Sequence, residues 1–329
     1  VVGLVGSEMC IRDRCDDDGD NDSRGIYVQG IVGGARVVDI VLADNDISYT
    51  YSSAIGVWGV PWRSDPGDFQ RIDGIVIEGN TIEHAVEGGW NEQITLANGV
   101  VNFVIRHNFL RHADDGTSGG EGIDIKEGCS FGSIHHNLIH HIQRRAIYID
   151  GGGRSDFASP THHIDVYANV AHDVVNGFAI MSEGGGDVHD IRVFNNLFYD
   201  IEEDGAFIYD HPDAAADPGS FWNIELVNNT FWRCGRNGLD LNSEQATAVV
   251  VNNNIFSTYR DRFEVASEDS NLEGGTPGFV DETAGDYHLL PGSSAIDVGT
   301  ADHAPDVDAD GVSRPQGDGF DLGAYEFNG

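Results

Sequence analysis

Lysine is almost absent from this chain of 329 residues, and basic residues as a whole are scarce. The sequence contains 17 arginines and a single lysine, Lys126, against 55 acidic residues, which gives a formal net charge of −37. A surface this negative repels nucleic-acid phosphates and anionic lipids, so neither is an expected partner. The charge suits a saline environment or carboxylates that are screened by bound Ca²⁺.

Cysteines and long hydrophobic runs are also few. The four cysteines, Cys10, Cys15, Cys129 and Cys234, have neither CxxC spacing nor a pairing pattern, so no structural metal site or disulfide framework is predicted from them. No stretch of 18 apolar residues occurs, so no membrane insertion is expected. The apolar content of 40% is normal for a chain that builds a core.

The first 14 residues, VVGLVGSEMCIRDR, resemble the translation of a sequencing adapter, a contaminant of metagenomic sequences. We interpret residues 1–14 as an artefact and exclude them from the fold. Residues 15–24 then form an acidic lead-in, and the native gene is expected to enter near Cys15, inside a longer protein. On this interpretation the lack of a signal peptide carries no information about secretion.

A repeat organises most of the remaining chain. Each unit has an alternating apolar strand, then an Asn, then two residues of which the second is usually apolar. Successive Asn anchors are 35, 28, 29, 32, 27, 33 and 25 residues apart. The anchors are Asn45, Asn80, Asn108, Asn137, Asn169, Asn196, Asn229 and Asn254.

A second short strand follows most anchors after eight or nine residues, with insertions in two units. Period-2 alternation between Gly and Asn predicts β-structure, and 25 to 35 residues are too few for a propeller blade of four strands. Three short strands per coil fit, so we expect an all-β, right-handed parallel β-helix of about eight to nine coils over residues 25–280. The second strands are GIYVQG (25–30), AIGVWG (54–59), EQITLAN (92–98), GIDIKEG (122–128), AIYIDG (146–151), GFAIMS (177–182), GAFIYD (205–210) and GLDLNS (238–243).

Stacking is what makes such a coil stable. One coil buries about six apolar side chains at roughly 2 kcal/mol each, less than the entropy cost of ordering about 28 residues. Neighbouring coils supply backbone hydrogen bonds and the rest of the core. We expect each repeated Asn to adopt positive φ at a bend, and its amide to hydrogen-bond to the equivalent amide about 4.8 Å away.

The repeat resembles the pectate-lyase-like β-helix superfamily over roughly residues 25–266. The tail motifs DYHLLPGSSAIDVG (286–299), DADGVSRP (308–315) and DLGAYEF (321–327) are similar to the closing segment of bacterial secreted β-helix proteins. The resemblance implies that residues 281–329 pack on the helix, and that the protein is an extracellular or cell-surface monomer with a polysaccharide partner. It leaves the activity open, because the superfamily includes lyases, hydrolases, epimerases and non-catalytic adhesins.

Alternate residues of the second strands point outward and form two rows. The first row is Tyr27, Gly56, Thr95, Asp124, Tyr148, Ala179, Phe207 and Asp240. The second row is Gln29, Trp58, Ala97, Lys126, Asp150, Met181, Tyr209 and Asn242. Aromatic rings, carboxylates and a lysine between long loops predict a saccharide-binding groove. The candidate substrate-binding residues are Trp58, Tyr148, Tyr209, Arg154 and Asn242.

Chemistry-bearing residues are densest around Lys126. Lys126 and Asp150 share a row one coil apart, so we expect them roughly 5 to 7 Å from each other. The segment GIDIKEG resembles segments of uronate-polysaccharide lyases, in which a strand lysine abstracts the C5 proton and Ca²⁺ neutralises the substrate carboxylate. The resemblance implies Lys126 as the base and Asp124, Glu127 and Asp150 as candidate calcium ligands, although the full ligand set of such lyases is not matched.

Three functions stay open at this point. Carboxylates around Lys126 raise its pKa and make it a poor base, whereas a bound Ca²⁺ reverses that field, so a lyase requires calcium. Without calcium, Lys126 is simply the positive partner of an acidic cluster. Asp124 and Asp150, roughly 8 Å apart, fit the acid and base of an inverting glycoside hydrolase. A non-catalytic surface or adhesive module that only binds carbohydrate is the third interpretation.

Histidines recur four residues after three successive anchors, at His84, His112 and His141. We expect this column to be a stack of neutral imidazoles at a turn, with a transition-metal site as the alternative.

The acidic run DVDADG (306–311) has the alternating Asp pattern of calcium loops. Asp306, Asp308 and Asp310 are therefore candidate ligands of a structural Ca²⁺, with a solvated acidic turn as the alternative.

Overall fold

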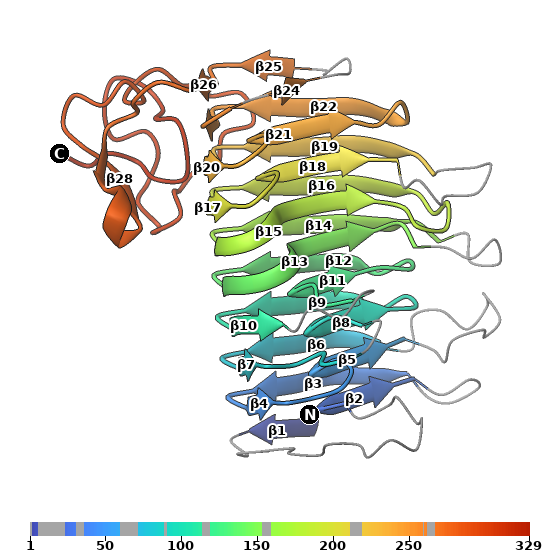
Figure 1. The fold of residues 1–329 in the computed structure, drawn as a ribbon. Helices are drawn as coiled ribbons and strands as arrows, with labels where there is room; N and C mark the ends of the chain where they lie inside the picture. The colour runs from blue at the N-terminus through green and yellow to red at the C-terminus, as the bar shows by residue number, and fades with distance from the viewer. Residues whose placement is uncertain are drawn as a thin grey trace.

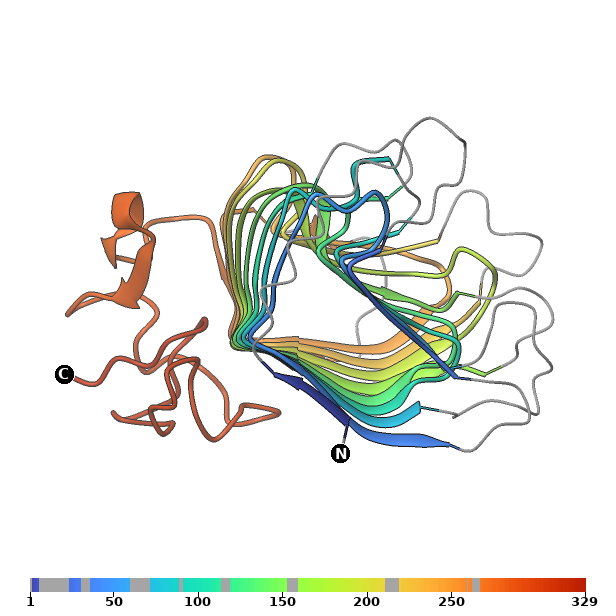
Figure 2. The same ribbon diagram turned by 90° about the horizontal axis from the view of Figure 1, so that it is seen from below.

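The computed structural model describes residues 2–5, 24–30, 36–59, 72–88, 91–113, 119–152, 159–210, 219–258, 260–261 and 267–329, with the backbone alone at 2–5 and 260–261. Parallel strands stack coil upon coil along one axis (Figure 1). Seen along that axis, the coils have three faces, and the C-terminal segment lies outside them (Figure 2).

The first face is a ten-stranded parallel sheet built from the alternating strands that precede the Asn anchors. Its strands, in spatial order, are β1 (Val2–Val5), β3 (Val37–Ala43), β6 (Ile72–Glu78), β9 (Val101–Arg106), β12 (Ser130–His135), β14 (Thr161–Tyr167), β16 (Val188–Phe194), β19 (Phe221–Val227), β22 (Ala246–Asn252) and β25 (Ser267–Asp269). 

The second face follows the Asn anchors, and the third face carries the second strands of the repeat. Two long strands, β13 (Leu138–Asp150) and β15 (Val170–Met181), bend and contribute to both faces. The second face also has β4 (Asp46–Ser48), β7 (Thr81–Glu83), β10 (Phe109–Ala113), β17 (Leu197–Ile201), β20 (Thr230–Cys234), β23 (Ile255–Phe256) and β26 (Leu272–Glu273). The third face also has β2 (Ile26–Gln29), β5 (Ile55–Trp58), β8 (Ile94–Ala97), β11 (Ile123–Ile125), β18 (Ala206–Tyr209), β21 (Leu239–Asn242) and β24 (Arg260–Asp261).

The register of the third face agrees with the predicted rows. Asp124 pairs with Thr95 on one side and with Tyr148 on the other, and the same row continues to Ala179 and Phe207. The alternate residues of these strands point inward and form buried columns. One column consists of Ile55, Ile94, Ile123, Ile147, Phe178, Ala206 and Leu239. The predicted parallel β-helix is therefore confirmed.

The Asn anchors form a continuous hydrogen-bonded ladder inside one corner of the helix. Each Nδ2 donates to the Oδ1 of the next anchor, at 2.8 to 3.1 Å from Asn45 to Asn254. Asn271, which was not recognised as an anchor, continues the ladder with an Nδ2–Oδ1 distance of 3.1 Å to Asn254. The predicted amide-to-amide bonding is confirmed.

The expectation that these asparagines adopt positive φ is wrong, because the left-handed residue is the one before each anchor. Asp44 and His107, for example, have φ values of 54° and 53°. Each coil from the one that contains Asn45 to the one that contains Asn229 has left-handed residues six before, one before and four after the anchor. Asp, Asn, His and Gly dominate these corners because they tolerate φ > 0 better than most residues. Each anchor Asn, which follows a left-handed residue, keeps its side-chain amide inside the turn.

The C-terminal segment packs on the outside of the later coils, against the second face. It contains β27 (Phe279–Asp281), the 3₁₀ turn η2 (Glu282–Ala284) and β28 (Asp286–Leu289), and β27 and β28 are antiparallel. Arg314 is fully buried there and donates to Glu326 at 2.7 Å. The predicted boundary between residues 280 and 281 falls inside β27.

Several other expectations concern the chain as a whole. Residues 2–5, within the adapter-like segment, form β1 and pair with β3, while the origin of residues 1–14 stays a prediction. Cys129 and Cys234, the two cysteines within the described residues, are free thiols. In the described part of the chain, no helix has the length and apolar character needed to cross a membrane.

Candidate functional site

Lys126 lies directly after β11 on the outer side of the third face. Its Nζ donates to Asp124 Oδ2 at 2.8 Å and to Glu92 Oε1 at 3.0 Å, and its side chain is 20% exposed. Burial alone would lower the pKa of Lys126, but Asp124 and Glu92 together raise it well above the usual lysine value. Lys126 is therefore a firmly held ammonium in this arrangement.

Glu92 was not identified from the sequence. It is buried, and its Oε2 accepts a hydrogen bond from the hydroxyl of Thr95 at 2.6 Å. Thr95 in turn lies 3.0 Å from the Ser53 hydroxyl. The sequence placed Glu92 at the start of the second-strand segment 92–98, and its side chain reaches Lys126 although the strand register aligns Thr95, not Glu92, with Asp124.

The surroundings of Asp124 disfavour its charged form. It is 1% exposed, and among the described residues its Oδ1 has no hydrogen-bond partner. Burial, Glu92 and Asp150 raise the pKa of Asp124 well above its usual value, although Lys126 opposes this effect. A buried carboxylate oxygen without a donor favours protonation or a cation.

Asp150 lies one coil above Lys126, at the end of β13. Its Oδ1 accepts the backbone N–H groups of Gly152 at 2.7 Å and Glu183 at 3.0 Å. Burial and the nearby carboxylate of Glu183 raise the pKa of Asp150 to about 7. Asp150 also acts electrostatically on both Asp124 and Lys126, so the structure brings the three predicted groups together.

Comparison with known proteins supports the assignment of the fold. No known protein-family profile matches the chain. Pectate lyase B of Dickeya chrysanthemi is 24% identical over 212 residues, which are 61% of this chain and 49% of that protein. The crystal structure of pectate lyase Pel9A superposes with a TM-score of 0.53 at 13% identity, over 93% of this chain and 86% of that one. 

The chain therefore has the parallel β-helix fold of pectate lyases. The xylose complex of XylC also matches, with a TM-score of 0.45 at 12% identity, over 74% of this chain and 40% of that one. This β-helix spans about half the length of the curated relative that it matches.

Tyr148, which the sequence predicted to stack on a sugar, is covered on the outer side of the third face. Tyr148 is only 2% exposed, and the Arg145 guanidinium lies 4.9 Å from its ring centre. Arg145 is anchored by Glu121 at 2.8 Å. Tyr148 also packs with Met181 and Phe207 in a small outer apolar cluster. Its ring is therefore not free to stack on a sugar in this state.

The remaining candidates for sugar binding lie toward the two ends of the rows. Trp58 is partly exposed and contacts the exposed Tyr27, with ring centres 5.1 Å apart. Tyr209 is 37% exposed and pairs with Asn242 on the next coil. Arg154 lies outside the described residues.

Two cavities lie away from Lys126 and its carboxylate partners. One, of about 460 Å³, separates the Asn corner from the C-terminal segment and is lined in part by His107, His136 and Tyr325. The other, of about 480 Å³, lies beside Asp173 and Asp200. The residues that line them do not include Lys126 or the carboxylates around it.

The carboxylates beside Lys126 fit a hard cation by their chemistry. Asp124, Asp150 and Glu127 offer oxygen ligands of the kind that Ca²⁺ prefers. Glu127 belongs to the same corner, because a Cβ added at Gly152 would lie 2.6 Å from its Cγ. The unpartnered Oδ1 of Asp124 is the atom that a cation would satisfy.

The acidic turn of the C-terminal segment is satisfied by its own chain. Asp308 Oδ1 accepts the N–H groups of Asp310 and Val312 at 2.9 and 2.8 Å, and its Oδ2 accepts that of Glu326 at 2.9 Å. Asp310 pairs with His288 at 2.8 Å. Asp306 Oδ atoms contribute no bond to this network. Calcium at this turn stays a prediction.

The predicted histidine column is a stack of rings. Tyr49, His84 and His112 lie nearly parallel, with ring centres 5.2 and 5.0 Å apart, and His141 follows at 4.9 Å. Burial and the neighbouring His141 and His84 lower the pKa of His112, which favours the neutral imidazole.

Proposed function

We propose that this β-helix is an extracellular polysaccharide lyase that acts on uronate chains by Ca²⁺-assisted β-elimination, with Lys126 as the base. The observation that carries the proposal is the position of the chain's single lysine among buried acids, one of which has an unpartnered oxygen. The pectate lyase names of the sequence relative and of the similar structure favour the same substrate class.

The neighbouring carboxylates determine the protonation state of Lys126, and only its neutral amine can act as a base. In the arrangement described here Asp124 and Glu92 keep its amine protonated. Ca²⁺ held by Asp124, Asp150 and Glu127 would neutralise the substrate carboxylate, acidify the C5 proton and offset the field that now holds the proton on Lys126.

The elimination itself uses one amine and one water molecule. The neutral amine of Lys126 takes the proton from C5 of the uronate. The electron pair of the broken C5–H bond forms the C4–C5 double bond as the C4–O bond breaks. Water then donates a proton to the leaving oxygen, and Lys126 is left as an ammonium that returns its proton to solvent.

Trp58 and Tyr209 are suited to hold the chain on either side of this point. They lie in the row of Lys126, two coils before it and three coils after it. At about 4.8 Å per coil these separations are about 10 and about 14 Å, the reach of a few sugar units. Asn242 adds a hydrogen-bonding amide next to Tyr209, and Arg154 is proposed as a further contact to the polyanion.

An inverting hydrolase is the second candidate, and one observation favours it. A pKa of about 7 for Asp150 is what a general acid needs at neutral pH. However, Asp124 Oδ2 is engaged by Lys126 Nζ at 2.8 Å, whereas an inverting pair needs its second carboxylate free to activate water. We therefore place the hydrolase second.

Products distinguish the three activities. The full chain is incubated with polygalacturonate, alginate and a neutral glycan, each with Ca²⁺ or with a chelator. Elimination yields ultraviolet-absorbing unsaturated ends, hydrolysis yields reducing ends without that absorbance, and a binding module yields neither. We expect unsaturated ends from a uronate polymer in Ca²⁺ only.

Lys126→Met tests the base directly. Loss of a general base typically costs about 10² to 10⁴ in rate, so elimination should fall by at least about 100-fold. The matched control is Arg106→Met, which removes a cation from an exposed ion pair with Glu78 on the first face and should leave the rate unchanged. Circular dichroism checks that both variants fold. Full elimination by folded Lys126→Met would remove the lysine from the mechanism.

A further inference from the structure

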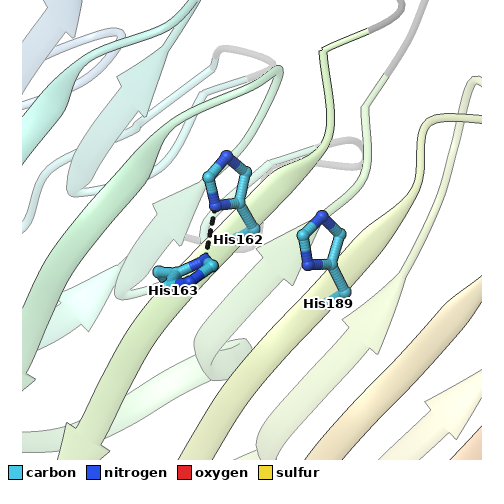
Figure 3. Close-up of side chains that lie close together, drawn as sticks. All are labelled: His162, His163 and His189. Atoms are coloured by element: carbon cyan, nitrogen blue, oxygen red, sulfur yellow. Dashed lines mark hydrogen bonds between the residues drawn. The ribbon is translucent and has the colours of Figure 1, made fainter.

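Three histidines converge on the first face, away from the strands that carry Lys126. His162 and His163 lie on β14, and His189 lies on the neighbouring strand β16 (Figure 3). One ligand atom from each imidazole lies within 4.8 Å of the other two. Among the described residues, no other group of three His, Cys, Asp or Glu side chains meets this condition.

The backbone explains why two consecutive residues of one strand both contribute. Neighbouring residues of a regular strand point to opposite faces. His163 has φ of 55°, at the corner six residues before Asn169, and this left-handed kink turns its ring to the same side as His162. The two Nδ1 atoms are 2.7 Å apart.

An acidic residue from the next coil borders the cluster and contacts two of its three imidazoles. Asp190 occupies the corner equivalent to His163, also with φ of 55°. Its Oδ2 lies 2.7 Å from His189 Nδ1 and 3.4 Å from His163 Nδ1. Its Oδ1 accepts a hydrogen bond from the Asn223 amide, which orients the carboxylate toward the histidines.

Ring stacking fixes the imidazoles before any ligand arrives. His162 and His189 are parallel, with ring centres 4.9 Å apart. Trp222 covers the far side of His189 at 4.3 Å, and Phe131 lies edge-on to His162 at 5.1 Å. Ligands held in this way lose little conformational freedom on binding.

We propose that His162, His163 and His189, with Asp190, form a binding site for a divalent transition-metal ion of the Zn²⁺ class. Three imidazoles and one carboxylate are a ligand set that suits Zn²⁺ and disfavours Ca²⁺, which prefers oxygen ligands. The ion would link two coils of the helix across β14 and β16. This site does not depend on the proposed lyase activity.

The geometry needs only small side-chain movements to accept the ion. Ligand atoms around a tetrahedral Zn²⁺ are about 3.3 Å apart, given metal–nitrogen distances of about 2.0 to 2.1 Å. The His162–His163 contact of 2.7 Å must open slightly, and the wider separations, up to 4.8 Å, must close. Rotation of the half-exposed His163 ring accomplishes much of this change.

A second group of three histidines and one aspartate in the same chain serves as an internal control. His140, His141, His172 and Asp173 occupy the equivalent positions at another corner, and His141 also has φ of 55°. There the rings of His141 and His172 are 6.5 Å apart, whereas those of His163 and His189 are 6.1 Å apart. No contact corresponding to that of His163 with Asp190 closes this second group among the described residues.

Calorimetric titration of the full, metal-free chain with ZnCl₂ tests the site. We expect one tight Zn²⁺ per chain and no displacement by millimolar Ca²⁺. His163→Asn, which keeps a residue that tolerates φ > 0, should weaken binding by more than about 100-fold, because even outer ligand partners contribute 10- to 100-fold. His141→Asn, its matched control, should bind Zn²⁺ as the unchanged chain does.

A second readout does not rely on heat of binding. Zn²⁺ should raise the unfolding temperature of the unchanged chain and of His141→Asn, but not that of His163→Asn. Asp190→Asn should fall between them. Unchanged Zn²⁺ affinity in folded His163→Asn, or equal losses in both histidine variants, would overturn the proposal.

Discussion

Replacing Asn169 by Ala should destabilise the β-helix strongly, because this residue makes four buried hydrogen bonds through its side chain. Its Nδ2 donates to Ile134 O at 2.9 Å and to Asn196 Oδ1 at 3.0 Å. Its Oδ1 accepts from Nδ2 of Asn137 at 2.9 Å and from the backbone N–H of Asn137 at 3.1 Å. At about 1 kcal/mol each, the loss is about 4 kcal/mol, and an unsatisfied Asn137 N–H raises it to about 6 kcal/mol.

Urea unfolding followed by circular dichroism measures this loss. The control is Asn271→Ala, at the last rung of the ladder, where the side chain is half-buried and water can replace the lost partners. We expect a loss of about 1 kcal/mol or less there. Equal losses for Asn169→Ala and Asn271→Ala would refute the idea that buried amide bonding stabilises the stack.

Two further predictions concern stability. Burial raises the pKa of Asp150 to about 7, so the folded protein binds a proton that the unfolded chain releases near pH 4. The free energy of unfolding should therefore fall by a few kcal/mol as the pH rises from about 4 to about 7. Asp150→Asn should flatten this fall, whereas Asp173→Asn, at an exposed position, should not. Arg314→Ala leaves Glu326 buried without its partner, at a cost of about 3 to 5 kcal/mol, so limited proteolysis should release the C-terminal segment, whereas Arg192→Ala, in an exposed pair with Glu225, should stay resistant.

The sequence was sufficient to predict the architecture because the repeat encodes it directly. The spacing of the Asn anchors set the coil length, and period-2 alternation separated inward residues such as Ile123 from outward residues such as Asp124. Each coil repeats the same hydrogen bonds, so the alignment of one coil can be checked against that of its neighbours. The register of the third face followed from aligning the second strands of the repeat, and the structure has the same register.

The sequence did not predict which outward residues are covered. Period-2 alternation gives the direction of a side chain but not what packs over it. Tyr148 was expected to be open, yet Arg145, from the bend in β13, lies over its ring. Glu92 was missed for a related reason, because the sequence placed it in the segment 92–98 but did not show that its side chain reaches Lys126.

The adjacent pair His162 and His163 shows a second limit. Consecutive residues of a strand normally face opposite ways, so the sequence analysis did not single out this pair. Only the left-handed φ of His163 turns both rings outward and brings them near His189. Knowing that each coil has three such corners would have located this cluster from the sequence.

The single lysine allows the most direct test of the proposed chemistry. Lys126 is labelled with an amine-reactive reagent over a range of pH, with and without Ca²⁺, and its modification is followed by peptide mass spectrometry, which separates it from the terminal amine. We expect a titration midpoint above that of an ordinary lysine without Ca²⁺, and a clear downward shift when Ca²⁺ is added. A midpoint that Ca²⁺ leaves unchanged or raises would contradict the account, because Lys126 would then stay protonated when the uronate substrate binds.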